Sequence, residues 1–147
     1  MGTTRVLLVA LLGLASRPVP AQGQLLVSGS PPPLVVSAAT AGSAPVSVTN
    51  SSTTYTLALT LGTHKLTGQI NAGMPTGTTL SVTLAAPPGA TSQGAVALST
   101  TPRDLVTNIN LTVASTRSIT YQLSASSAAG VVPAQTRTVT LTLTSAP

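Results

Sequence analysis

Large apolar side chains alternate with hydroxyl side chains along several stretches of this chain. The clearest stretches are residues 54–61, 80–84, 119–124 and 138–144. A period of two places the apolar side chains on one face and the hydroxyls on the other, as in a half-buried antiparallel strand. Threonine fills many of the polar positions, and its β-branched side chain favours strands. No apolar pattern repeats at helical spacing over ten residues, so the pattern predicts an all-β protein.

Turn-forming residues separate these stretches at short intervals. The breaks fall at 31–33, 41–43, 50–52, 62–64, 71–73, 75–77, 87–89, 101–104, 115–116 and 126–133. Weaker strand patterns lie at 34–37, 46–49, 66–70, 96–99 and 109–114, which gives about eight to ten strands. We therefore expect residues 34–147 to form an antiparallel two-sheet β-sandwich of immunoglobulin-like or jelly-roll-like type, with a small β-barrel as the alternative. The Cys…Trp…Cys hallmark of true immunoglobulin domains is absent.

The first 21 residues have the layout of a secretory signal peptide. Arg5 supplies the positive charge, residues 6–14 form a short apolar core, and residues 19–21 offer small side chains before a cleavage site after Ala21. A membrane-spanning helix needs about twenty apolar residues, and Arg17 with the following prolines ends this run earlier. We expect the mature protein to be secreted to the extracellular space or cell surface, with the periplasm as the alternative, and to lack a transmembrane segment.

Residues 22–33 join the predicted signal peptide to the predicted sandwich. They combine a short apolar strand with three consecutive prolines at 31–33, a stiff spacer. A strand on such a spacer can leave its own domain and extend the sheet of a neighbour, or it can pair at home with the prolines forming a bend. The candidate strand-exchange segment is Gln24, Leu25, Leu26, Val27 and Ser28.

Ionisable side chains are too scarce for most catalytic chemistry. The chain has one acidic residue, Asp104, one histidine, His64, and no cysteine. One imidazole and one carboxylate do not complete a zinc or calcium site, and no G-x-S-x-G or phosphate-binding loop is present. We predict no enzyme activity, metal or cofactor. His64 follows a glycine turn and is expected to be a solvated loop residue, and Asp104 is expected to bond backbone N–H groups in a turn.

The positive charge does not indicate a nucleic-acid partner. The formal net charge is +5, but the cations are scattered, and two tyrosines provide few stacking platforms. Asn50 and Asn110 each begin a match to the N-glycosylation pattern, which is weak in a chain rich in serine and threonine.

The predicted surface favours a role in assembly. Charges and prolines normally protect edge strands from pairing with other molecules, and this chain offers few charges for many strands. We expect a secreted, non-catalytic structural module, such as a cell-surface, matrix or pilus-like filament subunit, whose partner is another copy or another surface component. The alternative is a glycan- or ligand-binding module, although Tyr55 and Tyr121 fall in the inward register of their strands. With so few carboxylates, we also expect a melting temperature that is nearly flat from about pH 2 to pH 8.

Overall fold

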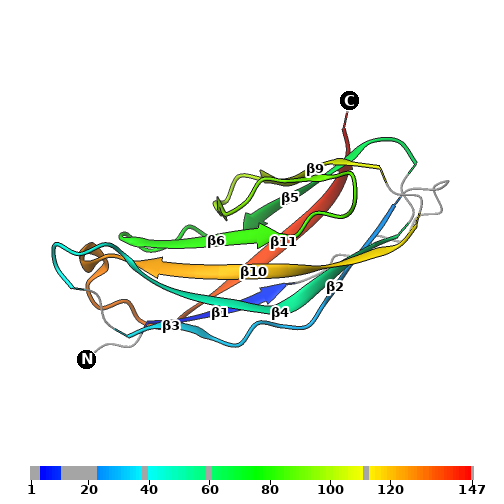
Figure 1. The fold of residues 1–147 in the computed structure, drawn as a ribbon. Coiled ribbons are helices and arrows are strands. Elements are labelled where there is room, and N and C mark those ends of the chain that lie inside the picture. Colours follow the sequence, from blue (N-terminus) through cyan, green and yellow to red (C-terminus); the bar gives the residue numbers. More distant parts are fainter. Residues whose placement is uncertain (1–3, 11–22, 38–39, 59–60, 111–112, 147) are drawn as a thin grey trace.

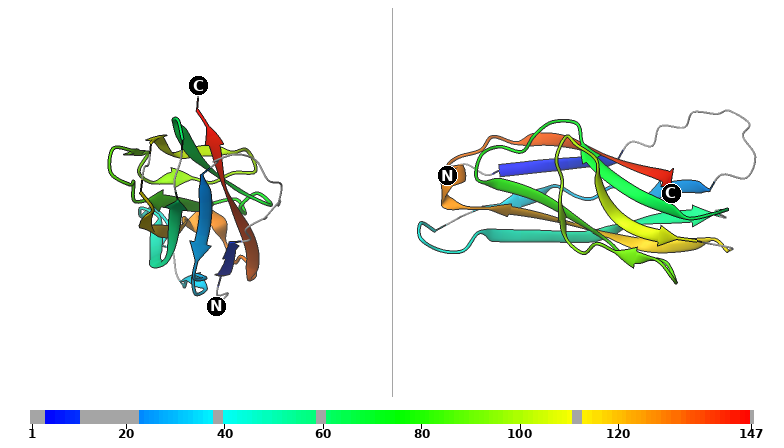
Figure 2. Two further views of the ribbon diagram at one scale, coloured as in Figure 1. Left: turned by 90° about the vertical axis from the view of Figure 1, so that its right-hand side faces the viewer. Right: turned by 90° about the horizontal axis from the view of Figure 1, so that it is seen from above.

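A computed structural model describes residues 4–10, 23–37, 40–58, 61–110 and 113–146. These residues form two sheets packed face to face in an elongated molecule whose strands run along its length (Figures 1 and 2). Both sheets have a linear strand order with open edges. The protein is therefore an all-β sandwich, as the alternation predicts, and the closed small barrel does not form.

The strands of the two sheets interleave along the sequence. The first sheet, here sheet A, has the order β3 (Leu34–Val36), β1 (Thr4–Ala10), β11 (Gln135–Ser145), β5 (His64–Ile70), β9 (Arg103–Ile109) and β7 (Thr91–Ser92). The second, sheet B, has the order β2 (Gln24–Ser28), β4 (Val46–Ala58), β10 (Ser115–Ala125), β6 (Thr78–Leu84) and β8 (Val96–Ala97). A single 3-10 turn, η1 (Ser127–Ala129), lies between β10 and β11 in the part of the chain described.

The ladders are antiparallel with one exception. Strand β1 runs parallel to β11, from Val6 opposite Gln135 to Ala10 opposite Val139. Its other edge pairs antiparallel with β3, from Thr4 opposite Val36 to Val6 opposite Leu34. The expected antiparallel sandwich therefore holds for the strands that follow residue 22, and residues 4–10 add a parallel strand inside sheet A.

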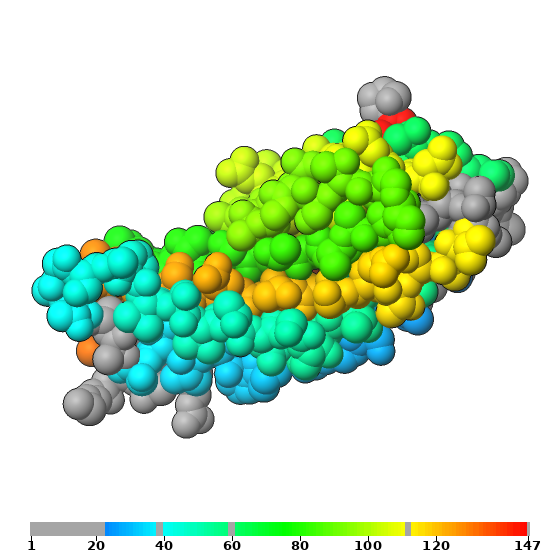
Figure 3. Space-filling view, viewed as in Figure 1, coloured from blue at the N-terminus to red at the C-terminus, as the bar shows by residue number. Residues whose placement is uncertain are grey.

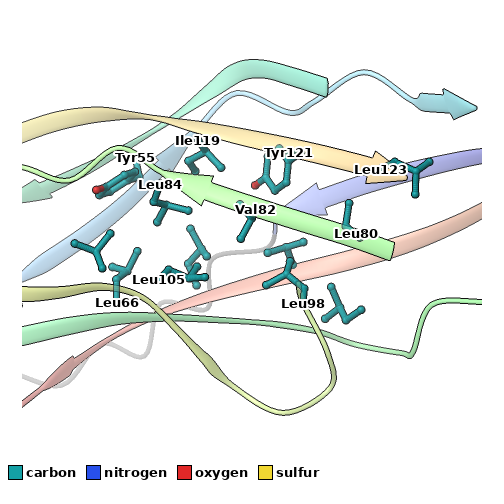
Figure 4. Packing of buried hydrophobic residues seen from close by; sticks show 14 of the residues in the cluster. Tyr55, Leu66, Leu80, Val82, Leu84, Leu98, Leu105, Ile119, Tyr121 and Leu123 are labelled. Atoms are coloured by element: carbon teal, nitrogen blue, oxygen red, sulfur yellow. The ribbon is translucent and has the colours of Figure 1, made fainter. Parts of the chain in front are cut away.

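The core lies between the sheets and is built from aliphatic side chains and two tyrosines. Tyr55 and Leu84 of sheet B face Leu66 and Leu105 of sheet A, and all four side chains are buried (Figure 4). Most inward positions of the strongest alternating stretches are buried as expected: Tyr55, Leu57, Leu80, Val82, Leu84, Ile119, Tyr121, Leu123, Val139 and Leu141. Leu143 is only partly buried, and Leu59 lies outside the described residues. Leu61 is 73% exposed, so its expected inward position is wrong, because β4 already ends at Ala58. Removal of these side chains from water is the main favourable contribution to folding.

The central strand β5 carries a glycine where its neighbours need space. A Cβ atom built on Gly68 would lie 2.6 Å from Leu105 Cδ1 on β9 and 3.3 Å from Leu141 Cδ2 on β11. The two leucines therefore fill the volume that a side chain on β5 would otherwise occupy, and the packing of sheet A depends on glycine at this position.

Two predicted breaks lie inside strands. Residues 50–52 belong to β4, and residues 115–116 begin β10. Between Ile119 opposite Thr53 and Tyr121 opposite Asn50, strand β4 has one residue more than β10. The polar residues 50–52 therefore form a β-bulge, which keeps the strand continuous while absorbing the extra residue.

Candidate functional site

His64 is a buried strand residue, so the expectation of a solvated loop histidine is wrong. Only 6% of its surface is exposed. It begins β5, where it shares the inward alternation of Leu66 and Ile70. Its Nδ1 lies 3.1 Å from the carbonyl oxygen of Gly62. The preceding glycine turn predicts exposure, but the alternation of side chains along β5 places the imidazole on the core side.

Asp104 lies in β9 rather than in a turn, so that expectation is also wrong. Its carboxylate forms an ion pair with Lys65 of β5, with Nζ 3.0 Å from Oδ1 and 3.3 Å from Oδ2. Both side chains are more than a third exposed. The β5–β9 register has an irregularity that places Asp104 opposite Thr67. Thr67 and Lys65 are two residues apart on β5, so they share one face of the sheet, and Asp104 meets Lys65 there.

The two ionisable residues with catalytic potential therefore lie on different faces of sheet A. His64 and Lys65 are consecutive residues of one strand, so their side chains point to opposite faces. His64 is opposite Ile109, while Asp104 is opposite Thr67. The fold separates the imidazole from the carboxylate. Over the described ranges, no three His, Cys, Asp or Glu residues come together as a metal-binding group.

Both tyrosines lie in the core, as their register predicts. Tyr55 and Tyr121 are 0% exposed, and Tyr55 Oη donates a hydrogen bond of 2.6 Å to the carbonyl oxygen of Ala85. Within the described part of the chain, Tyr121 Oη has no hydrogen-bond partner. Burial raises the pKa of each phenol to about 12. Neither ring is available at the surface as a platform for a sugar or a base.

The two glycosylation-pattern asparagines occupy different environments. Asn50 lies in the bulge of β4, where its Oδ1 accepts hydrogen bonds from Ser52 N at 3.1 Å and Ser52 Oγ at 2.8 Å. Asn110 is exposed directly after β9. The rest of its motif, residues 111–112, lies outside the described residues. Use of either asparagine stays a prediction.

The outer face of sheet B is a surface of hydroxyl groups. Strands β4, β10 and β6 lie side by side on the face shown in Figure 3. Their outward positions pair across the ladders, with Thr56 opposite Thr116 and Thr120 opposite Thr83. The Thr56 and Thr116 hydroxyl oxygens lie 2.8 Å apart. These four residues present short hydroxyl side chains, and none of them is ionisable.

The open edge of sheet B is the most distinctive candidate interaction site. Strand β2 pairs through one backbone edge with β4, from Gln24 opposite Ala58 to Ser28 opposite Thr54. It is the terminal strand in the sheet order, so its second edge has no ladder within the described residues. No residue of β2 is fully buried, and Leu26 is 57% exposed. The segment contains neither charge nor proline, the usual protections of an edge strand.

Three cations, Lys65, Arg117 and Arg137, lie on other strands than β2. The Arg137 guanidinium on β11 donates to the carbonyl oxygen of Gly73 from Nε at 3.1 Å and from Nη2 at 2.7 Å. Arg117 lies on β10 opposite Tyr55. Lys65 is paired with Asp104. The backbone groups of the β2 edge are therefore left without a nearby charge on their own strand.

Comparison of the chain with protein-family models, curated proteins and solved structures gives no match. The described segments also contain no helix whose length and apolar character would suit a membrane crossing. The arrangement of the residues themselves is thus the basis for a functional proposal.

Proposed function

We propose that this protein is a secreted, non-catalytic structural module that assembles with copies of itself through strand contacts. One observation carries the proposal: β2 presents an open, uncharged strand edge with an exposed leucine at its centre. Such an edge is a template for pairing with another chain. The signal-peptide layout of residues 1–21 supports export, so assembly would take place outside the cytoplasm, at a cell surface or in a matrix or filament.

Two further features support this proposal over catalysis or glycan binding. The imidazole and the carboxylate lie on opposite faces of sheet A, which separates an acid from a base. The aromatic side chains of the chain are the two tyrosines, and both are buried. Stacking on a surface ring, a common way to hold a sugar, therefore has no residue to carry it.

Expression of the full chain in a secreting host tests the proposal. Amino-terminal sequencing of the exported protein should begin at Gln22. Size-exclusion chromatography and electron microscopy should show oligomers or filaments whose fraction grows with protein concentration. A strictly monomeric product at high concentration would contradict self-assembly, and an unprocessed amino terminus would contradict the proposed export signal.

A matched pair of variants distinguishes contact through the β2 edge from nonspecific association. Leu26→Lys places a charge on the exposed edge strand, and Thr120→Lys places one on β10, in the middle of sheet B. We expect Leu26→Lys to lower the assembled fraction at least about tenfold, because burying the charge at a contact costs more than about 1.4 kcal/mol. Thr120→Lys should change it little. Equal effects of the two variants would count against edge pairing.

A further inference from the structure

Strand β1 occupies a position in sheet A that export would vacate. Residues Thr4–Ala10 lie between β3 and β11 and form ladders with both. In Figure 1, β1 lies beside β3 along one side of the sandwich. The same residues fall within the predicted signal peptide. Cleavage after Ala21 would remove a strand whose two neighbours belong to the mature protein.

The space left by β1 would be one strand wide, and its inner side would be lined by Leu34 and Val36 of β3 and by Gln135, Arg137 and Val139 of β11. Neighbouring strands are about 4.8 Å apart, so β3 and β11 would face each other across about 10 Å. Strand β3 has β1 as its ladder partner within the described residues. Leu34, Val36 and Val139, which flank the space, are at most 5% exposed when β1 is present. Without an occupant, their backbone groups and apolar side chains would meet water, so this slot favours a replacement strand.

The mature chain carries a second copy of the sequence that fills the slot. Strand β1 contains Leu7-Leu8-Val9, and β2 contains Leu25-Leu26-Val27. Each tripeptide is flanked on its carboxyl side by a small residue, Ala10 or Ser28. Aligning the tripeptides gives Leu26 the register of Leu8, opposite Arg137 of β11. Positions 6, 8 and 10 of β1 share one alternation along the strand. Val6 lies opposite Leu34 and Ala10 lies opposite Val139, and both Leu34 and Val139 are buried.

The three apolar side chains of β2 would exchange faces in the slot. In its own position β2 packs Leu25 and Val27 against the core as partly buried side chains. Strand β2 has three consecutive apolar residues. At home, Leu26 lies opposite Thr56 and is 57% exposed. In the register of Leu8 it would take the alternation of the core-facing positions, and Leu25 and Val27 would take the outward alternation.

We infer that residues Gln24–Ser28 of one copy occupy, in a second copy, the place that β1 holds between β3 and β11. The inference rests on the proposed function, because it requires the leader to be removed and the mature chains to associate. Residues 29–33 then connect the donated strand to its own sandwich, and the three prolines at 31–33 keep this connection stiff. Each copy gives one strand to the next copy and accepts one from the previous copy, a head-to-tail contact that builds an open-ended filament when the rotation between copies does not close a ring.

Introduced cysteine pairs can test the inference, because the chain has no cysteine of its own. Processed protein carrying Leu26→Cys is mixed with processed protein carrying Arg137→Cys, and the mixture is allowed to assemble and oxidise. Opposed residues on paired strands lie within the Cα separation that a disulfide requires. We expect covalent heterodimers at a yield at least about tenfold above that of a control mixture of Leu26→Cys with Thr56→Cys.

A second arrangement locks the donor strand at home. Combining Leu26→Cys and Thr56→Cys in one chain places the two cysteines opposite each other in the β2–β4 ladder. We expect the oxidised form not to assemble and the same sample to assemble after reduction. Because both states share one sequence, this comparison stays informative if Arg137→Cys disturbs the fold through loss of the contacts to Gly73.

The outcomes separate the two proposals. If the wild-type protein forms filaments and the locked form assembles equally well, strand donation by β2 is wrong while self-assembly stands. In a chain that carries both Leu26→Cys and Arg137→Cys, a disulfide that closes within that chain would show that β2 fills its own slot, which also overturns the inference. A wild-type protein that stays monomeric would overturn the proposed function itself.

Discussion

Strands β10 and β2 belong to the same sheet but differ in how they are held. Strand β10 pairs with β4 on one edge and β6 on the other, and Ile119, Tyr121 and Leu123 along it are 0% exposed. Strand β2 pairs on one edge, and none of its five residues is fully buried. Similar backbone ladders therefore carry different roles, because the burial of side chains determines how much a strand adds to stability.

The largest expected difference comes from truncating one leucine-sized side chain in each strand. Ile119→Ala removes a fully buried side chain from β10 and should lower the free energy of unfolding by about 2–5 kcal/mol. Leu26→Ala removes a mostly exposed side chain from β2 and should lower it by less than about 1 kcal/mol. Chemical denaturation monitored by circular dichroism measures both. Similar losses for the two variants would show that β10 and β2 contribute equally to stability, contrary to this expectation.

An intermediate effect is expected from the phenols buried beneath β4 and β10. Burial raises the pKa of Tyr55 and Tyr121 from 10.0 to about 12, so the folded state favours the neutral phenol. The corresponding stability is present below pH 10 and is lost as the pH rises toward 12. Each tyrosine contributes about 2–3 kcal/mol to this loss.

Alkaline titration followed by tyrosinate absorbance and circular dichroism tests this expectation. Ionisation of the two phenols should coincide with unfolding. Tyr121→Phe keeps most of the ring packing and removes one ionisable group, so the variant should lose less stability over the same pH range. Ionisation at pH 10 without unfolding would show that the rings are not enclosed as the structure places them.

The smallest expected effect concerns the ion pair on the surface of sheet A. Lys65 and Asp104 are both more than a third exposed, and solvent screens such a pair. Asp104→Asn should therefore change the free energy of unfolding by no more than about 1 kcal/mol. Calorimetry should also find the melting temperature nearly unchanged from about pH 8 to pH 2. A steep fall below about pH 4 that disappears in Asp104→Asn would assign this carboxylate a larger role.

Local alternation was enough to predict the long strands at 54–58, 80–84, 119–124 and 138–144 and much of the core. The strand expected at 109–114 is wrong, because β9 ends at Ile109 and β10 begins at Ser115. The inward positions of residues 80–84 and 119–123 could be assigned because a period of two is a property of the segment itself. Residues 50–52 were misread as a turn, since a bulge and a turn use the same polar residues and differ only in what the partner strand does. The glycine turn before His64 predicts exposure, whereas its alternation with Leu66 predicts burial, and the fold follows the alternation.

The candidate interaction site can be located only from the fold. The sequence singles out residues 24–28 as a candidate strand for exchange, but the place of that strand at the edge of sheet B follows from ladders between distant segments. The slot between β3 and β11 is likewise a non-local feature, since its walls are about a hundred residues apart in the sequence. The sequence contains the repeated Leu-Leu-Val, but only the position of β1 between β3 and β11 connects the repeat with strand exchange.

The glycine in the middle of β5 has a consequence for how this sequence can change over evolution. Positions 68 and 105 share one volume, because the space beside the backbone of Gly68 is filled by the Leu105 side chain. A methyl group at 68 requires a smaller side chain at 105, so the two positions should vary together in any related chain. A homologue with alanine at 68 and leucine at 105 would have to spread β5 and β9 apart to accommodate both.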